Sequence, residues 1–143
     1  AADASAVSAA ASAMVAHTGH AGVQKECASL LACLCSGDDP RAVNARKQAA
    51  EKGAIGAVVQ ALNCYSDNVA LQVAGISALN GICSGSGPDA QERRKLAREA
   101  GAVDAVMAAR TFHLRSGSVQ KVGSAALRVL NLRAASGPID PGA

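Results

Sequence analysis

A chain of 143 residues with half of its residues hydrophobic is long enough to form one domain with a buried core. Tyr65 and Phe112 are its only Phe, Tyr or Trp residues and the net charge is a mild +3, which argues against a surface that stacks nucleic-acid bases. No apolar run approaches the roughly 20 residues that are needed to cross a bilayer.

The first expected helix covers residues 2–17 and is rich in Ala and Ser. An apolar segment, VQKECASLLACLCSG, begins at Val23, and a charged segment, RAVNARKQAAEK, follows it. Asp39-Pro40 precedes the charged segment and Gly53 closes it. Pro suits the first position of a helix, and Gly can adopt the left-handed conformation that ends one. We therefore expect a charged helix here, with a sharp turn at Gly53.

The next segments repeat this order. GAIGAVVQAL begins at Gly53 and LQVAGISALNGICSG begins at Leu71, where Leu71, Ile76 and Leu79 have the spacing of a helix. A second charged segment, DAQERRKLAREA, lies between Gly87-Pro88 and Gly101. No segment alternates strictly with a period of two. The sequence therefore predicts an all-α protein.

A spacing of 48 residues connects the segments. VQKECASLLACLCSG, LQVAGISALNGICSG and VQKVGSAALRVLNLR start 48 residues apart, and so do GAIGAVVQAL and GAVDAVMAAR. A fixed period in two independent segments indicates a solenoid. The predicted array covers residues 1–133, in units 5–52, 53–100 and 101–133, and residues 134–143 are expected to form a flexible tail. Solenoid units bury their faces only against neighbours, so we expect further repeats or another chain to cover the ends.

The repeated segments resemble the armadillo repeat family. GAIGAVVQAL and GAVDAVMAAR resemble the family's GAIPALVxLL second helix, and the three segments that begin with VQ or LQ resemble its VQxxAxWALxNLA third helix. The Gly that opens the second helix favours armadillo over HEAT repeats, although the period exceeds the usual range of about 40–47 residues. The resemblance implies a right-handed superhelix of about three repeats, whose third helices line a concave groove that holds partner segments.

The resemblance also implies which residues line this groove. They would be small or hydroxyl-bearing on one side and apolar with a basic edge on the other, which suits a helix or an extended apolar peptide with an acidic residue. The implied partner-binding residues are Glu26, Ser29, Cys33, Ser77, Asn80, Gly81, Val122, Ala125, Arg128, Val129 and Arg133. The alternative is that Val122 and Val129 pack against a following repeat and that the serines are simply solvated.

In the family's nuclear-import adaptors, the groove carries a Trp and, four residues later, an Asn. The corresponding positions here hold Ser29, Ser77 and Ala125 in place of Trp, and Cys33, Gly81 and Val129 in place of Asn. Asn80 is one residue out of register, about 100° round the helix. We therefore expect a protein-binding scaffold rather than a karyopherin-type cargo adaptor. The same pattern is also compatible with a structural subunit of a larger assembly and with a peripheral membrane adaptor.

The charged segments hold many basic residues interleaved with Asp and Glu. We expect them to form a solvated outer face with weak local ion pairs, rather than a basic ridge for acidic partners. The basic residues are Arg41, Arg46, Lys47, Lys52, Arg93, Arg94, Lys95 and Arg98.

The sequence offers no constellation that predicts catalysis, a metal site or a cofactor. His17 and His20 lie three residues apart without a second close pair of ligands, and zinc needs four. Cys33 and Cys35 do not form a CxxC redox pair. We expect neither an enzyme nor a cofactor-binding protein. The odd number of cysteines favours a reducing intracellular compartment, with the cytoplasm preferred to the nucleus.

Overall fold

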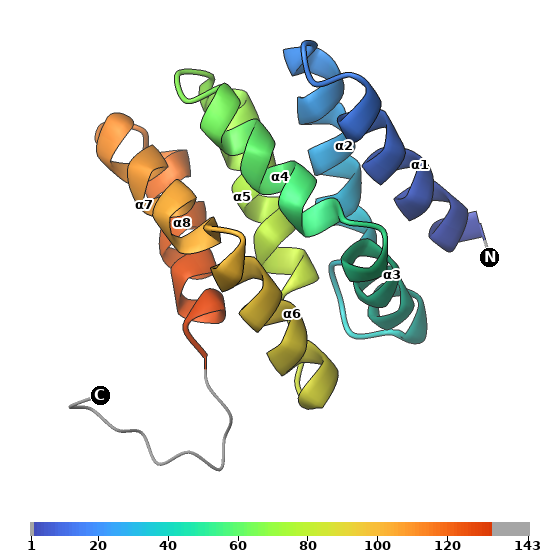
Figure 1. The fold of residues 1–143 in the computed structure, drawn as a ribbon. Coiled ribbons are helices and arrows are strands. Elements are labelled where there is room, and N and C mark those ends of the chain that lie inside the picture. Colours follow the sequence, from blue (N-terminus) through green and yellow to red (C-terminus); the bar gives the residue numbers. More distant parts are fainter. Residues whose placement is uncertain (1, 133–143) are drawn as a thin grey trace.

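The computed structural model describes residues 2–132, and over that part of the chain it contains eight α-helices and no strand (Figure 1). The all-α prediction is confirmed, and the arrangement is compatible with an α-solenoid. The predicted tail, residues 134–143, lies outside the described residues. In chain order the helices are α1 (Ala2–Ala16), α2 (Ala21–Leu34), α3 (Pro40–Glu51), α4 (Ala54–Cys64), α5 (Val69–Ile82), α6 (Pro88–Glu99), α7 (Ala102–Phe112) and α8 (Gly117–Leu130).

The helices lie side by side in two layers (Figure 1). One layer holds α2, α5 and α8, in which α5 contacts both neighbours, and the other holds α1, α4 and α7. Each helix of the second layer packs against the helix that follows it in the chain. The short charged helices α3 and α6 lie at one end of the layers. The stack therefore has two edges, formed by α1 and α2 on one side and by α7 and α8 on the other.

The starts of α3, α4 and α7 follow from the Pro and Gly pattern. Asp39 caps α3, because its side chain accepts a hydrogen bond of 2.9 Å from the Ala42 backbone N–H, and Pro40 occupies the first helical position. Gly53 and Gly101 precede α4 and α7 with φ of 79° and 92°. Only glycine adopts this left-handed conformation without strain. These residues let the chain turn directly from a charged helix into an apolar one.

Three glutamines make the same pair of hydrogen bonds in successive units. In each case Nε2 donates to one carbonyl in the last turn of the preceding helix, which no helical N–H reaches, and to one carbonyl in the turn that follows it. The donors and acceptors recur at intervals of 48 residues. The pairs are Gln24 with Met14 (2.9 Å) and His17 (2.8 Å), Gln72 with Leu62 (3.0 Å) and Tyr65 (2.8 Å), and Gln120 with Arg110 (2.8 Å) and His113 (3.0 Å).

The turns that follow α1, α4 and α7 are connected across units. The Tyr65 hydroxyl donates to the Thr18 carbonyl oxygen at 2.6 Å, and Nε2 of His113 lies 2.7 Å from the Ser66 carbonyl oxygen. Both bonds join residues 47 positions apart. Each unit is thereby fixed to the turn of the unit before it.

The basic residues of α3 and α6 correct one expectation. Arg46, Arg93 and Arg94 are buried, so these helices are not a uniformly solvated face. Arg46 Nε donates to the Cys35 carbonyl at 2.9 Å, and Arg94 Nε donates to the Cys83 carbonyl at 3.0 Å. These carbonyls lie where α2 and α5 end, at the negative pole of each helix dipole. Apolar stems and charge-assisted bonds to the backbone explain the burial.

Two arginines also join one unit to the next. Arg46 Nε lies 3.2 Å from the Gly81 carbonyl oxygen of α5, and Arg98 Nη1 donates to the Leu130 carbonyl of α8 at 2.7 Å. Arg93 adds bonds to the Ile82 carbonyl at 2.7 Å and to the Ser84 carbonyl at 2.9 Å. The charged helices therefore hold together the ends of the α2, α5 and α8 layer.

Candidate partner-binding groove

An open depression of about 660 Å³ lies on the layer formed by α2, α5 and α8. Its walls come from α2 and α5, and one residue comes from α8. The gap between the helices is not filled, because most of the residues that face it are Ala, Ser or Val. The lining consists of Lys25, Ser29 and Ala32 of α2, Val69, Ala70, Val73, Ala74 and Ser77 of α5, and Ser118 of α8.

The lining combines apolar surface with a few polar groups. Val69 and Val73 supply apolar contact area on α5, and the three serines supply hydroxyl groups that both donate and accept hydrogen bonds. Among the residues that the structure describes, Lys25 is the only charged one in the lining. Mostly apolar walls with a few placed polar groups are typical of a binding site.

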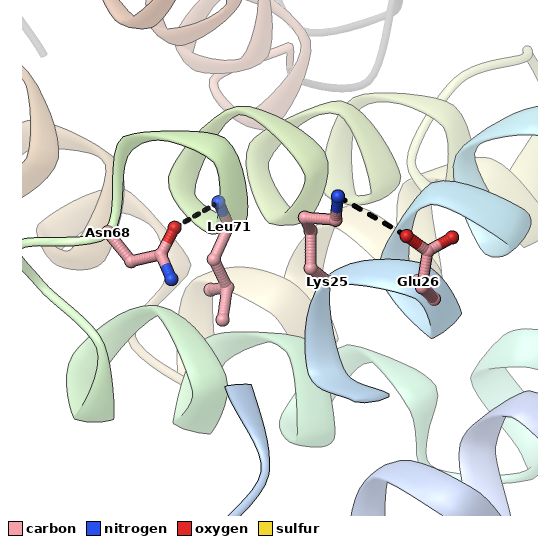
Figure 2. A network of polar contacts seen from close by, with 4 residues as sticks. All are labelled: Lys25, Glu26, Asn68 and Leu71. Atoms are coloured by element: carbon pink, nitrogen blue, oxygen red, sulfur yellow. Dashed lines mark hydrogen bonds and ion pairs between the residues drawn. The ribbon is translucent and has the colours of Figure 1, made fainter. Parts of the chain in front are cut away.

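Helix capping fixes where the helices of the groove begin. The Asn68 side chain accepts a 3.0 Å hydrogen bond from the Leu71 backbone N–H at the start of α5 (Figure 2). Ser116 makes the equivalent bond of 3.2 Å to Val119 at the start of α8. His20, at the corresponding position before α2, makes no side-chain cap bond. The capped starts position Val69, Ala70 and Ser118 at one end of the depression.

Lys25 makes an ion pair with its neighbour Glu26, with 3.2 Å between Nζ and Oε2 (Figure 2). Both side chains are exposed to solvent to a large extent. Pairs of this kind contribute at most about 1 kcal/mol, because water screens the charges. The Lys25 ammonium group can therefore exchange Glu26 for a carboxylate of a bound partner at little cost.

The structure brings only some of the implied groove residues of α2 and α5 into the depression. Ser29 and Ser77 line it, whereas Glu26 and Cys33 are exposed on α2 outside the lining. Asn80 is half-buried, further along α5. Gly81 faces α2, since a Cβ atom added to it would lie 3.4 Å from the Cys35 Cβ atom. Position 81 therefore lies in the interface between α5 and the end of α2.

The implied residues of α8 lie outside the depression. Val122, Ala125 and Val129 are half-buried and Arg128 is exposed. Arg133 lies outside the described residues. Arg128 and the exposed Lys121 give α8 two accessible cations.

Some of the lining residues that the implied set lacks follow from helix spacing. On α5 the implied residues begin at Ser77, whereas the depression extends back to Val69, the first residue of the helix. Residues four apart share a helix face, so counting back from Ser29 and Ser77 gives Lys25 and Val73, which do line it. The same step finds Val69 from Val73. Ala32, Ala70 and Ser118 have no comparable sequence signal.

Among the side chains that the structure describes, in residues 5–132, no three His, Cys, Asp or Glu form a group that could hold a metal ion. The His17 and His20 rings are in edge contact, with 5.9 Å between centroids. Cys35 and Cys83 are buried, and burial raises the pKa of each thiol to about 11, which disfavours the nucleophilic thiolate.

The described helices also carry no membrane signal, because none of them is long and apolar enough to cross a bilayer. In comparisons with protein-family models, curated proteins and solved structures, no match to the chain was found. The function must therefore be inferred from the depression and from the contacts that repeat along the stack.

Proposed function

We propose that this chain is an armadillo-type α-solenoid that acts as a non-enzymatic protein-interaction module. Its groove holds a peptide or helix of a partner protein. The observation that carries the proposal is the open depression between α2 and α5, with its apolar walls, its serine hydroxyls and Lys25. No cofactor is required for this activity.

The armadillo-type architecture is supported by contacts that recur once per unit. Gly53 and Gly101 make the same left-handed turn before α4 and α7, as the family resemblance implies for the start of the second helix. The glutamine and arginine bonds to helix ends recur at the same interval of 48 residues. Successive units therefore present equivalent residues in equivalent directions, which a continuous groove requires.

The lining indicates the chemistry of the partner. Apolar side chains would contact Val69 and Val73, and the serine hydroxyls would pair with polar groups of the partner's backbone. A carboxylate would pair with Lys25, and further acidic residues would be attracted to Lys121 and Arg128. The expected partner segment is thus apolar with acidic residues, presented as a helix or an extended strand.

The test uses a displayed library of random peptides, selected on the 143-residue chain. We expect enrichment of apolar peptides that contain Asp or Glu. Ala70→Glu places a carboxylate in the depression, which repels the acidic residues of the enriched peptides, and should weaken their binding at least about tenfold, which corresponds to about 1.4 kcal/mol. The matched control is Ala108→Glu, because Ala108 is also an exposed helical alanine but lies on α7.

Binding of the enriched peptides should be measured by fluorescence anisotropy for both variants. Equal binding to Ala70→Glu and Ala108→Glu would locate the peptides elsewhere and contradict the proposed groove. Enrichment of Lys- and Arg-rich peptides would instead indicate a cargo adaptor for basic signals.

A further inference from the structure

The two edges of the stack expose positions that are buried inside it. Met107 of α7 is 54% exposed, whereas the equivalent Ala11 and Val59 of the two earlier units are 2% and 4% exposed. Leu30 of α2 is 41% exposed, whereas the equivalent Ala78 and Ala126 of the two later units are 0% exposed. The position of Met107 is buried only in units that have a following unit, and the position of Leu30 is buried only in units that have a preceding unit.

The same comparison defines two faces. The leading face lies at the α2 edge, and its residues are less buried than their equivalents in both later units. The trailing face lies at the α7 and α8 edge, and its residues are less buried than their equivalents in both earlier units. The leading face consists of Val23, Cys27, Leu30 and Leu34, and the trailing face consists of Val103, Met107, Ser124 and Leu127.

A second observation concerns the bonds between turns. Tyr65 reaches the carbonyl of Thr18 and His113 reaches that of Ser66, each in the preceding unit. The equivalent of Tyr65 and His113 in the first unit is His17, which is exposed. The equivalent of Thr18 and Ser66 in the last unit is Leu114, which is 71% exposed. The edge at α1 and α2 thus carries a side chain equivalent to the one that makes this bond, His17. The edge at α7 and α8 carries the equivalent acceptor, the Leu114 carbonyl.

From these two observations we infer that a second copy of this chain docks head to tail, with its leading face on the trailing face of the first. The contact continues the interface that already joins the units within one chain. His17 of the added copy then bonds to the Leu114 carbonyl of the first. Because the two faces are different, each added copy leaves a new free face, so association does not stop at a dimer. This association is independent of what the groove binds.

The internal interface gives a distance that tests the arrangement. A Cβ atom at Gly81 would lie 3.4 Å from the Cys35 Cβ atom. Between copies, the equivalent pair is Cys33 and Asn131, both of which are exposed. Disulfides join Cβ atoms about 3.5–4.5 Å apart, so a thiol at position 131 would be within reach of Cys33 of the next copy.

The first experiment is oxidative cross-linking of the 143-residue chain carrying Asn131→Cys, with Cys64→Ser to remove the other exposed thiol. We expect a ladder of covalent oligomers on a non-reducing gel, which disappears when Cys33→Ser is added. Absence of a ladder, or a ladder that persists with Cys33→Ser, would overturn the inference.

The second experiment measures sedimentation of the chain without any cross-link. Wild type should form oligomers whose size increases with concentration. Leu30→Glu blocks the leading face and Met107→Glu blocks the trailing face, and each should weaken self-association at least about tenfold. Mixing the two variants should give dimers and nothing larger, because one intact face remains on each. Circular dichroism checks that both variants retain their helical content.

The matched control is Val43→Glu on α3, since Val43 is 52% exposed but belongs to neither face. It should associate as wild type does. A monomer at every concentration would overturn the inference. So would a dimer that only one of the two face variants disrupts, because that result would indicate a symmetric contact.

Discussion

Gly75 and Gly123 occupy equivalent positions on α5 and α8, and both face the preceding helix. A Cβ atom at Gly75 would lie 2.7 Å from Leu62 Cδ2 and 3.2 Å from Leu62 Cγ. A Cβ atom at Gly123 would lie 2.7 Å from Arg110 Cγ and Cδ. Leu62 is 2% exposed, so its side chain would have to move within the core, whereas Arg110 is a half-buried, flexible chain. A methyl group should therefore be harder to accommodate at Gly75 than at Gly123.

Alanine at these two positions should have different effects. Within a helix, Ala is favoured over Gly by about 1 kcal/mol. At Gly75, overpacking against Leu62 costs about 1–3 kcal/mol and outweighs this gain, so Gly75→Ala should destabilise the protein. Gly123→Ala should be close to neutral, because Arg110 can rotate away but loses its 3.1 Å hydrogen bond to Gln120 Oε1, which offsets the gain in helix propensity. Urea unfolding measures both, and changes of the same sign and size would contradict this account.

At the scale of the single helix, the ends of α2 and α5 depend on buried arginines. Arg94 donates to the carbonyls of Cys83 and Gly85, and Arg46 donates to those of Cys35 and Gly37 in the equivalent positions of the previous unit. Burial lowers the pKa of the neighbouring Arg93, and the nearby Arg46 and Arg94 cations lower it further. The guanidinium groups of Arg46 and Arg94 therefore place a positive charge at the carbonyl ends of α2 and α5, respectively.

Replacing Arg94 by Met should test this role at nearly constant side-chain length. The Cys83 and Gly85 carbonyls would lose charge-assisted bonds, each of which contributes about 1.5–3 kcal/mol. We expect the free energy of unfolding to fall by roughly 2–5 kcal/mol for Arg94→Met. Lys95→Met is the matched control, since Lys95 is adjacent but exposed, and should change stability by less than about 0.5 kcal/mol. Equal losses in urea unfolding would show that the arginine is not a cap.

The helices themselves could be predicted because their signals are local. Asp39-Pro40, Gly53 and Gly101 mark helix ends through backbone chemistry that needs no distant partner. The burial of Arg46, Arg93 and Arg94 could not be predicted, because their partners are carbonyl groups that every residue carries. The position of the groove was missed by about one helical turn for a related reason. The alignment of the third helices shows which helix face the units have in common. The distance between neighbouring helices decides where along that face the depression opens.

At the scale of the whole molecule, two thiols lie in the interior of the stack. Cys35 and Cys83 are equivalent residues at the ends of α2 and α5, and both are completely buried. Burial raises the pKa of each from 9.0 to about 11, although nearby arginine cations oppose the shift. The folded protein therefore retains these protons at pH values where the unfolded chain releases them.

Stability should accordingly decrease in alkaline solution. A raised thiol pKa contributes stability that is fully present below pH 9 and is lost as the pH rises towards about 11. The expected loss is on the order of 2 kcal/mol for each thiol. Urea unfolding across this window measures it, and Cys83→Ala should reduce the pH dependence. An unchanged pH dependence in Cys83→Ala would contradict the prediction.

The hydrogen bonds from Tyr65 to Thr18 and from His113 to Ser66 fix the spacing between units along the chain, since each joins residues 47 positions apart. Duplicating or deleting one 48-residue period preserves the sequence separation within each pair and changes only the number of such pairs. An insertion of a few residues between the two members of a pair would instead change the spacing of that pair. The length of this protein can therefore change by whole periods while the contacts between its units keep their spacing.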